Sequence, residues 1–136
     1  MTVEELKHAL INYNHINQWW EVNNDRIQCI IYDMEDVKGI RFDSEPTNAN
    51  TDRQKKLIDL IEKKEKLILK NKYYFDVVNE VRDFIEWLDE PYRSIIIDKY
   101  LNELSDSKLE LKHGYERSSI WHIVNRMIQK YIDVST

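Results

Sequence analysis

A seven-residue repeat of side chains between residues 52 and 89 constrains this chain more than any other feature of its sequence. One row of the repeat holds Leu60, Leu67, Tyr74, Val81 and Leu88, and the interleaved row holds Leu57, Lys64, Asn71, Val78 and Ile85. This alternation of three and four residues is the heptad pattern of a helix that buries one seam. At ~1.5 Å per residue the helix is more than ~50 Å long, so it needs a partner along its length.

Two partners fit this seam, namely the N-terminal helical region of the same chain or a second copy of the chain. An asparagine at a seam position can set the register of a dimer, at a cost in stability, and Asn71 occupies such a position. The alternative is that Asn71 faces solvent where the helix leaves the seam. We predict a homodimer whose seam is formed by Leu60, Leu67, Asn71, Tyr74, Val78 and Val81.

The scarcity of glycine and proline indicates an all-α protein. The 136 residues include only two of each, too few for the many tight turns of a β-sandwich or barrel. Gly39 and Gly114 stand far apart in the sequence, which excludes a glycine-rich phosphate loop. With 42% hydrophobic residues, the chain also has enough apolar side chains to build a packed core.

The remaining apolar spacing divides the chain into two regions. Helical periodicity runs from Thr2 to about Met34, with Thr2 and Glu5 placed as a capping box. A loop-like connector follows at 37–52. We predict a helical dimerisation or bracing region at 1–89 and a helix-turn-helix domain at 90–136, because Pro91 separates the long helix from the next one.

Three helices are expected in the second region. A first helix covers 91–102, a short helix runs from the N-cap Ser105 to Gly114, and a longer one covers 115–132. Short helix, glycine turn and longer helix is the layout of a helix-turn-helix motif. The longer helix offers side chains of types that read base edges or hold phosphates, namely Arg117, Ser118, Ser119, His122, Asn125, Arg126 and Lys130.

Residues 88–132 resemble the C-terminal, sigma-region-4-like helix-turn-helix of small phage transcriptional regulators of the ArpU and RinA type. The matching features are Lys99-Tyr100-Leu101, Gly114-Tyr115 and Asn125-Arg126. A further string resembles the middle of those proteins, namely Gly39, Ile40, Arg41, Phe42, Asp43 and Pro46. The resemblance implies a regulator that reads duplex DNA with its C-terminal helix.

Acidic residues in the same region favour a second reading. Glu110 stands where the family has a small residue, His113 replaces a leucine, and Glu116 replaces the capping serine. Residues 82–136 carry eight basic and ten acidic residues, and the whole chain has a net charge of −5. The alternative function is therefore an acidic phage inhibitor, anti-CRISPR-like or a DNA mimic, that binds a host nucleic-acid-handling protein.

Other functional classes find little support in the sequence. No nucleophile, base and acid stand at a recognisable spacing, so we predict neither an enzyme nor a cofactor. His8 and His15 share a helical face but are too few for a metal site. Cys29, among isoleucines, is expected to be a buried thiol, which fits a cytoplasmic protein. No apolar run is long enough to span a membrane.

Overall fold

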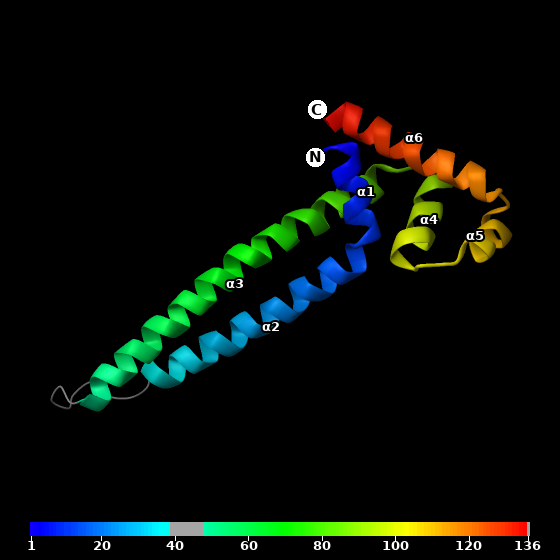
Figure 1. Ribbon diagram of the computed structural model, residues 1–136. Helices are drawn as coiled ribbons and strands as arrows, with labels where there is room; N and C mark the ends of the chain where they lie inside the picture. The colour runs from blue at the N-terminus through cyan, green and yellow to red at the C-terminus, as the bar shows by residue number, and fades with distance from the viewer. Residues whose placement is uncertain (39–47, 136) are drawn as a thin grey trace. The chain divides into compact units, whose positions relative to one another are not determined.

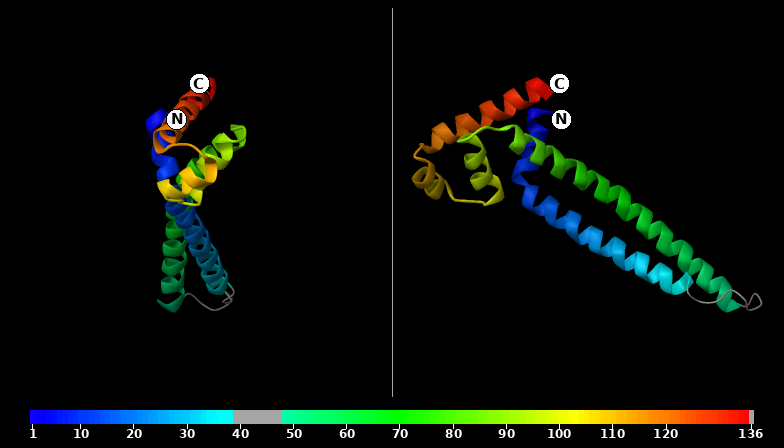
Figure 2. Two further views of the ribbon diagram at one scale, coloured as in Figure 1. Left: turned by 90° about the vertical axis from the view of Figure 1, so that its right-hand side faces the viewer. Right: turned by 180° about the vertical axis from the view of Figure 1, so that it is seen from behind.

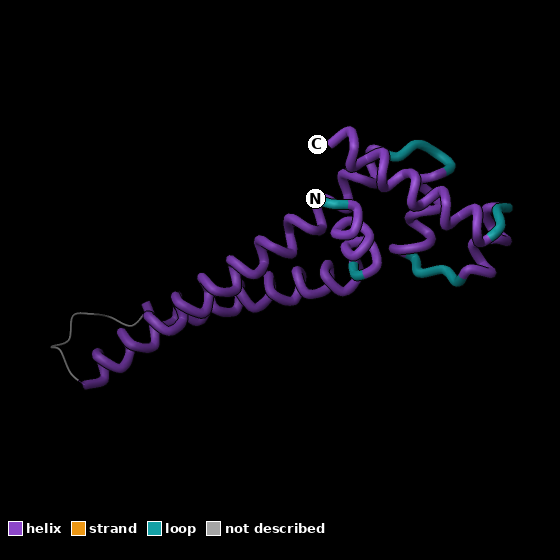
Figure 3. The backbone as a smooth tube through the Cα atoms, turned by 45° about the horizontal axis from the view of Figure 1, so that its top comes forward, coloured by secondary structure: helices purple, strands orange, loops and turns teal. Residues whose placement is uncertain are grey.

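The computed structural model describes residues 1–38 and 48–135, and it confirms an all-α fold, with no strand in these residues (Figure 3). The elements in chain order are α1 Val3–Ile11, α2 Tyr13–Lys38, α3 Asn48–Trp87, α4 Tyr92–Ile96, the π-helical turn η1 Ile97–Leu101, α5 Asp106–His113 and α6 Arg117–Ser135. Within the described residues, no helix is both long and apolar enough to cross a bilayer.

The first helical segment divides into two helices at Asn12. The backbone N–H and the side-chain Nδ2 of Asn12 both donate to the carbonyl oxygen of His8, at 3.1 and 2.9 Å. The first bond is a regular helical one, whereas the second lets the Asn12 side chain share the same acceptor, as asparagine does where it competes with the helix ladder at a helix end. At the other end, Thr2 Oγ1 accepts from the Glu5 N–H at 3.2 Å, which confirms the predicted N-cap.

The expected connector at 37–52 is shortened from both sides. Helix α2 continues to Lys38, and α3 begins at Asn48, so seven residues assigned to the loop by their composition are helical. The string of Gly39, Ile40, Arg41, Phe42, Asp43 and Pro46 that resembles the phage regulators lies outside the described residues.

The helices form two compact units. One unit comprises Met1–Asn17 together with Asp76–Thr136, and the other comprises Gln18–Phe75. This division differs from the predicted boundary between residues 89 and 90. The reason is that α3 contributes side chains to both cores, so the division falls inside a helix where the sequence shows no break in composition.

The core of the first unit is built from α1, the C-terminal half of α3, and α4 to α6 (Figure 1). Phe84 on α3 is fully buried and lies at 5.1 Å, centroid to centroid, from the ring of Tyr131 on α6. The most completely buried side chains around it are Leu6, Leu10, Val78, Val81, Leu88, Ile95, Ile96, Leu109 and Ile128. Burial of these side chains stabilises the unit by the hydrophobic effect and holds α5 and α6 in place.

An arginine closes the C-terminal end of α3. Arg93 on α4 donates from Nε to the carbonyl oxygen of Ile85 at 3.0 Å and from an Nη to that of Glu86 at 2.9 Å. These carbonyls belong to the last turn of α3, where the regular helical donors four residues on are missing, although the Leu88 N–H also donates to the Ile85 carbonyl oxygen at 3.2 Å. A cation at this end also opposes the negative end of the helix dipole.

The second unit is an antiparallel pair of helices, the Gln18–Lys38 part of α2 beside the Asn48–Phe75 part of α3 (Figure 2). Met34, Val37 and Leu60 form its small buried cluster. Asn71 on α3 is 5% exposed and donates from Nδ2 to the Trp20 carbonyl oxygen at 3.2 Å and to Asn24 Oδ1 at 2.6 Å. Asn71 therefore does not face solvent, and its amide joins two helices of the same chain.

The heptad seam of α3 is covered within one chain. All ten seam positions are buried or half-buried, including the six assigned to a dimer: Leu60, Leu67, Asn71, Tyr74, Val78 and Val81. The N-terminal part of the seam lies against α2, and the C-terminal part belongs to the core of the first unit. A homodimer stays a prediction, and at these six positions it would compete with the intrachain packing.

Replacement of Asn71 by alanine tests which partner the seam has. We expect N71A to lower the free energy of unfolding by about 1–3 kcal/mol, because two buried hydrogen bonds are lost and a cavity is left. Because Asn71 bonds within the chain, the loss measured by urea denaturation should not change with protein concentration. K72A at the next, exposed position is the control, and a loss that grows on dilution would indicate that Asn71 pairs two chains instead.

Candidate functional site

The candidate site is the exposed side of α6 and the end of α5 that precedes it. Ser105 Oγ accepts from the Lys108 N–H at 3.3 Å and caps α5, as predicted. Leu109 is buried and anchors α5 to the core. Gly114 ends α5 in the left-handed conformation, with φ of 73°, and a Cβ built there meets no atom within 4 Å. The short turn that follows leads directly into α6 at Arg117.

Helix α6 has one buried and one exposed side. Its buried side chains are Ile120, Ile123, Val124, Met127, Ile128, Tyr131 and Ile132. Their spacing of three and four residues is that of an amphipathic helix that lies on a core. All seven residues predicted to touch DNA lie on α6, and five of them are exposed: Arg117, Ser118, His122, Arg126 and Lys130.

The other two predicted residues are less available. Ser119 and Asn125 are half-buried. The Asn125 side chain donates from Nδ2 to the Trp121 carbonyl oxygen at 2.8 Å, so a bond within the helix occupies its amide group. Neighbouring Trp121 is 59% exposed. The bond from Asn125 to the Trp121 carbonyl oxygen must break before the Asn125 Nδ2 can donate to DNA.

The charge on α6 differs from that of the chain as a whole. Between Arg117 and Lys130 the helix carries three cations and no carboxylate. The acidic residues that make residues 82–136 negative lie on other elements or at the two ends of α6. The middle of the exposed side is therefore basic, although the net charge of the region is −2.

A carboxylate from α5 holds the N-terminal end of α6. Glu110 Oε1 accepts from the backbone N–H of Arg117 at 2.9 Å and lies 3.4 Å from the Arg117 Nε. Asp106 lies 3.6 Å from the same Nε. Glu110 thus occupies one of the free amide groups at which helix N-termini bind phosphate. The sequence marks Glu110 as a departure from the pattern of the phage regulators that it resembles, but it does not reveal that Glu110 caps α6.

A shallow groove of about 660 Å³ lies at this end of α6. Its lining residues are Glu110, Glu116, Arg117, Ser118 and Trp121. Glu116 is exposed, which brings a second carboxylate to the mouth of the groove. The N-terminal end of α6 is therefore acidic and aromatic, in contrast to the basic stretch that follows.

A buried aspartate fixes α5 against the preceding turn. Asp98 in η1 is 4% exposed and accepts from Lys112 Nζ, His113 Nε2 and Asn102 Nδ2, each at 2.8 Å. Hydrogen bonding from Lys112 is the main reason that the pKa of Asp98 falls from 3.8 to about 2, and burial opposes the shift. His113, which replaces the leucine of the family pattern, is thus one of three donors to a single carboxylate.

No metal site is evident in residues 1–38 and 48–135, where no three His, Cys, Asp or Glu side chains gather closely enough to hold an ion. The two histidines considered for one, His8 and His15, are both exposed. Cys29 is exposed as well, so the prediction of a buried thiol is wrong. It is separated from the isoleucines around it because adjacent helix positions point in different directions.

Comparison with known proteins leaves the family open. The sequence matches no protein-family model, and neither the curated proteins nor the solved structures gave a match. The resemblance to the ArpU and RinA type of phage regulator therefore stays a prediction that rests on the motifs in residues 88–132.

Acid titration tests the role of Asp98. Because its pKa is lowered on folding, its stabilising effect of about 2 kcal/mol is complete above pH 4 and is lost as the pH falls through 2. We expect D98N to be less stable than the parent chain at pH 6 and to lose less stability between pH 4 and pH 2, as measured by circular dichroism melts. D76N, at an exposed position, is the control, and equal acid sensitivity of D98N and the parent would contradict this role.

Proposed function

We propose that this protein binds duplex DNA through the exposed side of α6, as a phage-type transcriptional regulator does. The observation that supports this most is the run from Arg117 to Lys130, which has three cations and no carboxylate on a chain with a net charge of −5. A helix of 19 residues with one side bound to the core and the other free has the dimensions to enter a major groove.

The exposed side chains divide into two roles in this proposal. Arg126 and Lys130 are four residues apart, hence neighbours on the helix, and they contact backbone phosphates. Ser118 and His122, also four apart and nearer the N-terminus, face base edges, where hydroxyl and imidazole groups donate and accept. A homodimer would place two such helices on half-sites separated by whole turns of the duplex.

Arg117 contacts DNA only after its ion pairs with Asp106 and Glu110 are broken. Its ion pairs with Asp106 and Glu110 are at 3.6 and 3.4 Å, and its side chain is 61% exposed. Exposed pairs of this length are weak, so a phosphate competes for the guanidinium. Glu110 and Glu116 repel that same phosphate, which keeps the affinity for DNA low unless the rest of the interface is good.

Binding to DNA fragments at several salt concentrations tests the proposed phosphate contacts. Using fluorescence anisotropy on fragments from the region of the genome that encodes the chain, we expect R126A and K130A each to reduce the slope of log K against log salt by about 1. Q129A, an exposed neutral change between them, should leave the slope unaltered. Unchanged slopes for both cationic variants would show that this side of α6 does not hold the backbone.

Removal of the carboxylate at the end of α6 should strengthen DNA binding. The E110Q side chain retains an oxygen that caps the Arg117 N–H, while it removes one of the two carboxylates that pair with the guanidinium. We expect roughly three- to tenfold tighter binding to the same fragments at low salt. E4Q, in the first turn of α1, carries the same charge change at a residue that does not line the groove beside Arg117. Equal effects of the two variants would mean that net charge, and not Glu110, limits binding.

A second candidate function is supported by the acidic end of α6. Glu110, Glu116 and the exposed Trp121 share one groove, and such a surface fits a cationic segment of a host protein that normally handles nucleic acid. In this function the chain is an inhibitor that uses a helix-turn-helix layout without reading DNA. E116K distinguishes the two candidates, because it strengthens binding to DNA but weakens binding to a basic partner.

A further inference from the structure

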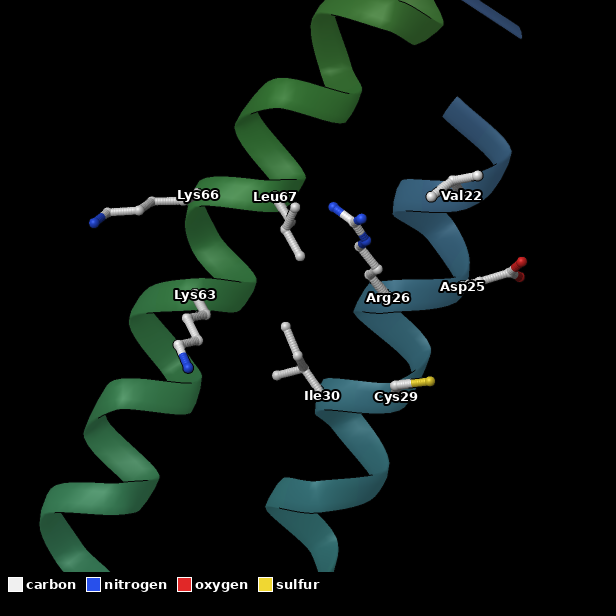
Figure 4. Close-up of a pocket in the computed structure, with 8 residues that line it drawn as sticks. All are labelled: Val22, Asp25, Arg26, Cys29, Ile30, Lys63, Lys66 and Leu67. Carbon is white, nitrogen blue, oxygen red and sulfur yellow. The ribbon is translucent and has the colours of Figure 1, made fainter. Parts of the chain in front are cut away.

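A groove of about 620 Å³ lies along the helix pair of the second unit (Figure 4). Leu67 on α3 and Ile30 on α2 point into the space between the two helices, and Val22 extends the apolar lining. All three of these side chains are half-buried, so the pair of helices leaves them incompletely covered. The incompletely covered aliphatic side chains leave room for a further apolar side chain to pack against them.

The groove is also basic. Arg26, Lys63 and Lys66 line it against one carboxylate, Asp25. Arg26 reaches into the space between the helices, whereas Lys66 and Asp25 point outward at its margins (Figure 4). In the described part of the chain none of these three cations is paired with a carboxylate. The part of α3 in this unit, residues 48–75, carries eight cations and four carboxylates, so the charge extends along the helix.

The lining of the groove repeats at the spacing of a coiled coil. Val22 and Cys29 are seven residues apart on α2. Of the exposed lysines on α3, Lys63 lines the groove, and Lys56 and Lys70 stand one heptad before and after it, beyond the lining. A third helix laid along the pair would meet an apolar floor and a row of ammonium groups at intervals of one heptad, or ~10.5 Å.

We propose that this groove binds an acidic amphipathic helix of a protein partner, as the third helix of a coiled coil. Aliphatic side chains of that helix cover Val22, Ile30 and Leu67, and its flanking carboxylates pair with Arg26, Lys63 and Lys66. A nucleic acid fits less well, because the groove has no aromatic side chain on which a base stacks and phosphates leave the apolar floor uncovered. This interaction is independent of DNA binding by α6.

Cys29 supplies a direct measurement, because it is the only cysteine of the chain and lies exposed at the margin of the groove. The probe is a synthetic peptide of about three heptads with Leu at positions a and d and Glu at e and g. We expect it to slow the reaction of Cys29 with a chromogenic disulfide reagent roughly tenfold at saturation, and to show binding by anisotropy when labelled. A peptide that leaves the reaction rate unchanged overturns the proposal.

Charge exchange gives the matched control. K63E/K66E should weaken binding of the acidic peptide roughly tenfold and allow binding of the same peptide with Lys in place of Glu. K55E/K72E makes the same change in net charge at exposed positions of α3 that do not line the groove, and it should bind like the parent. Equal loss in both double variants, or stronger protection of Cys29 by an oligonucleotide than by the acidic peptide, would refute a helix-binding groove.

Discussion

The stripe of seam residues along α3 is the constraint on which the rest of the structure depends. A helix of 40 residues has little stability by itself in water, and most of its stability comes from burial of one side. Toward the N-terminus of α3 the stripe is covered by α2, with Leu60 in a small cluster. Toward the C-terminus Val78, Val81 and Phe84 form the centre of the other core. The two cores therefore share this one helix, and each is built on a different part of its stripe.

The polar seam position shows why the stripe selects one arrangement. Asn71 stands between apolar seam residues and donates to a backbone carbonyl and to Asn24 on α2. Were α2 to slide along α3 by one turn, this amide would lose both acceptors in a buried place, at a cost of about 1–3 kcal/mol. In coiled-coil dimers a polar seam residue fixes the register of two chains. In this protein Asn71 fixes the register of two helices within one chain.

Local features of this fold follow from the sequence, whereas long-range partners do not. The caps at Thr2 and Ser105 and the end of α5 at Gly114 depend on residues within one turn, and the sequence places all three correctly. The bond from Asn71 to α2 and the three donors on Asp98 join residues that only the folded chain brings together. Likewise, helical periodicity located the seven candidate DNA-contacting residues on α6, but it did not reveal that the Glu110 carboxylate accepts from the N-terminal end of this helix.

Local charge explains more about the candidate site than net charge. Residues 82–136 are negative in sum, yet Arg126 and Lys130 stand one turn apart on α6, whereas Glu110 and Glu116 lie at the N-terminal end of the helix. Helix α6 thus carries a basic surface and an acidic surface within a few turns of each other. A partner that touches the middle of α6 meets an environment unlike the one at its N-terminal end.

The turn at Gly114 has a consequence for how this arrangement varies between sequences. A Cβ at this position meets nothing within 4 Å, so a side chain there costs only the left-handed backbone conformation, about 1 kcal/mol for most residues and less for asparagine. Glu103 already adopts such a conformation, with φ of 51°, without being glycine. Chains with the same three helices can therefore carry another residue here only at the cost of this backbone strain, with asparagine the mildest choice, and a search for relatives that requires glycine would pass over them.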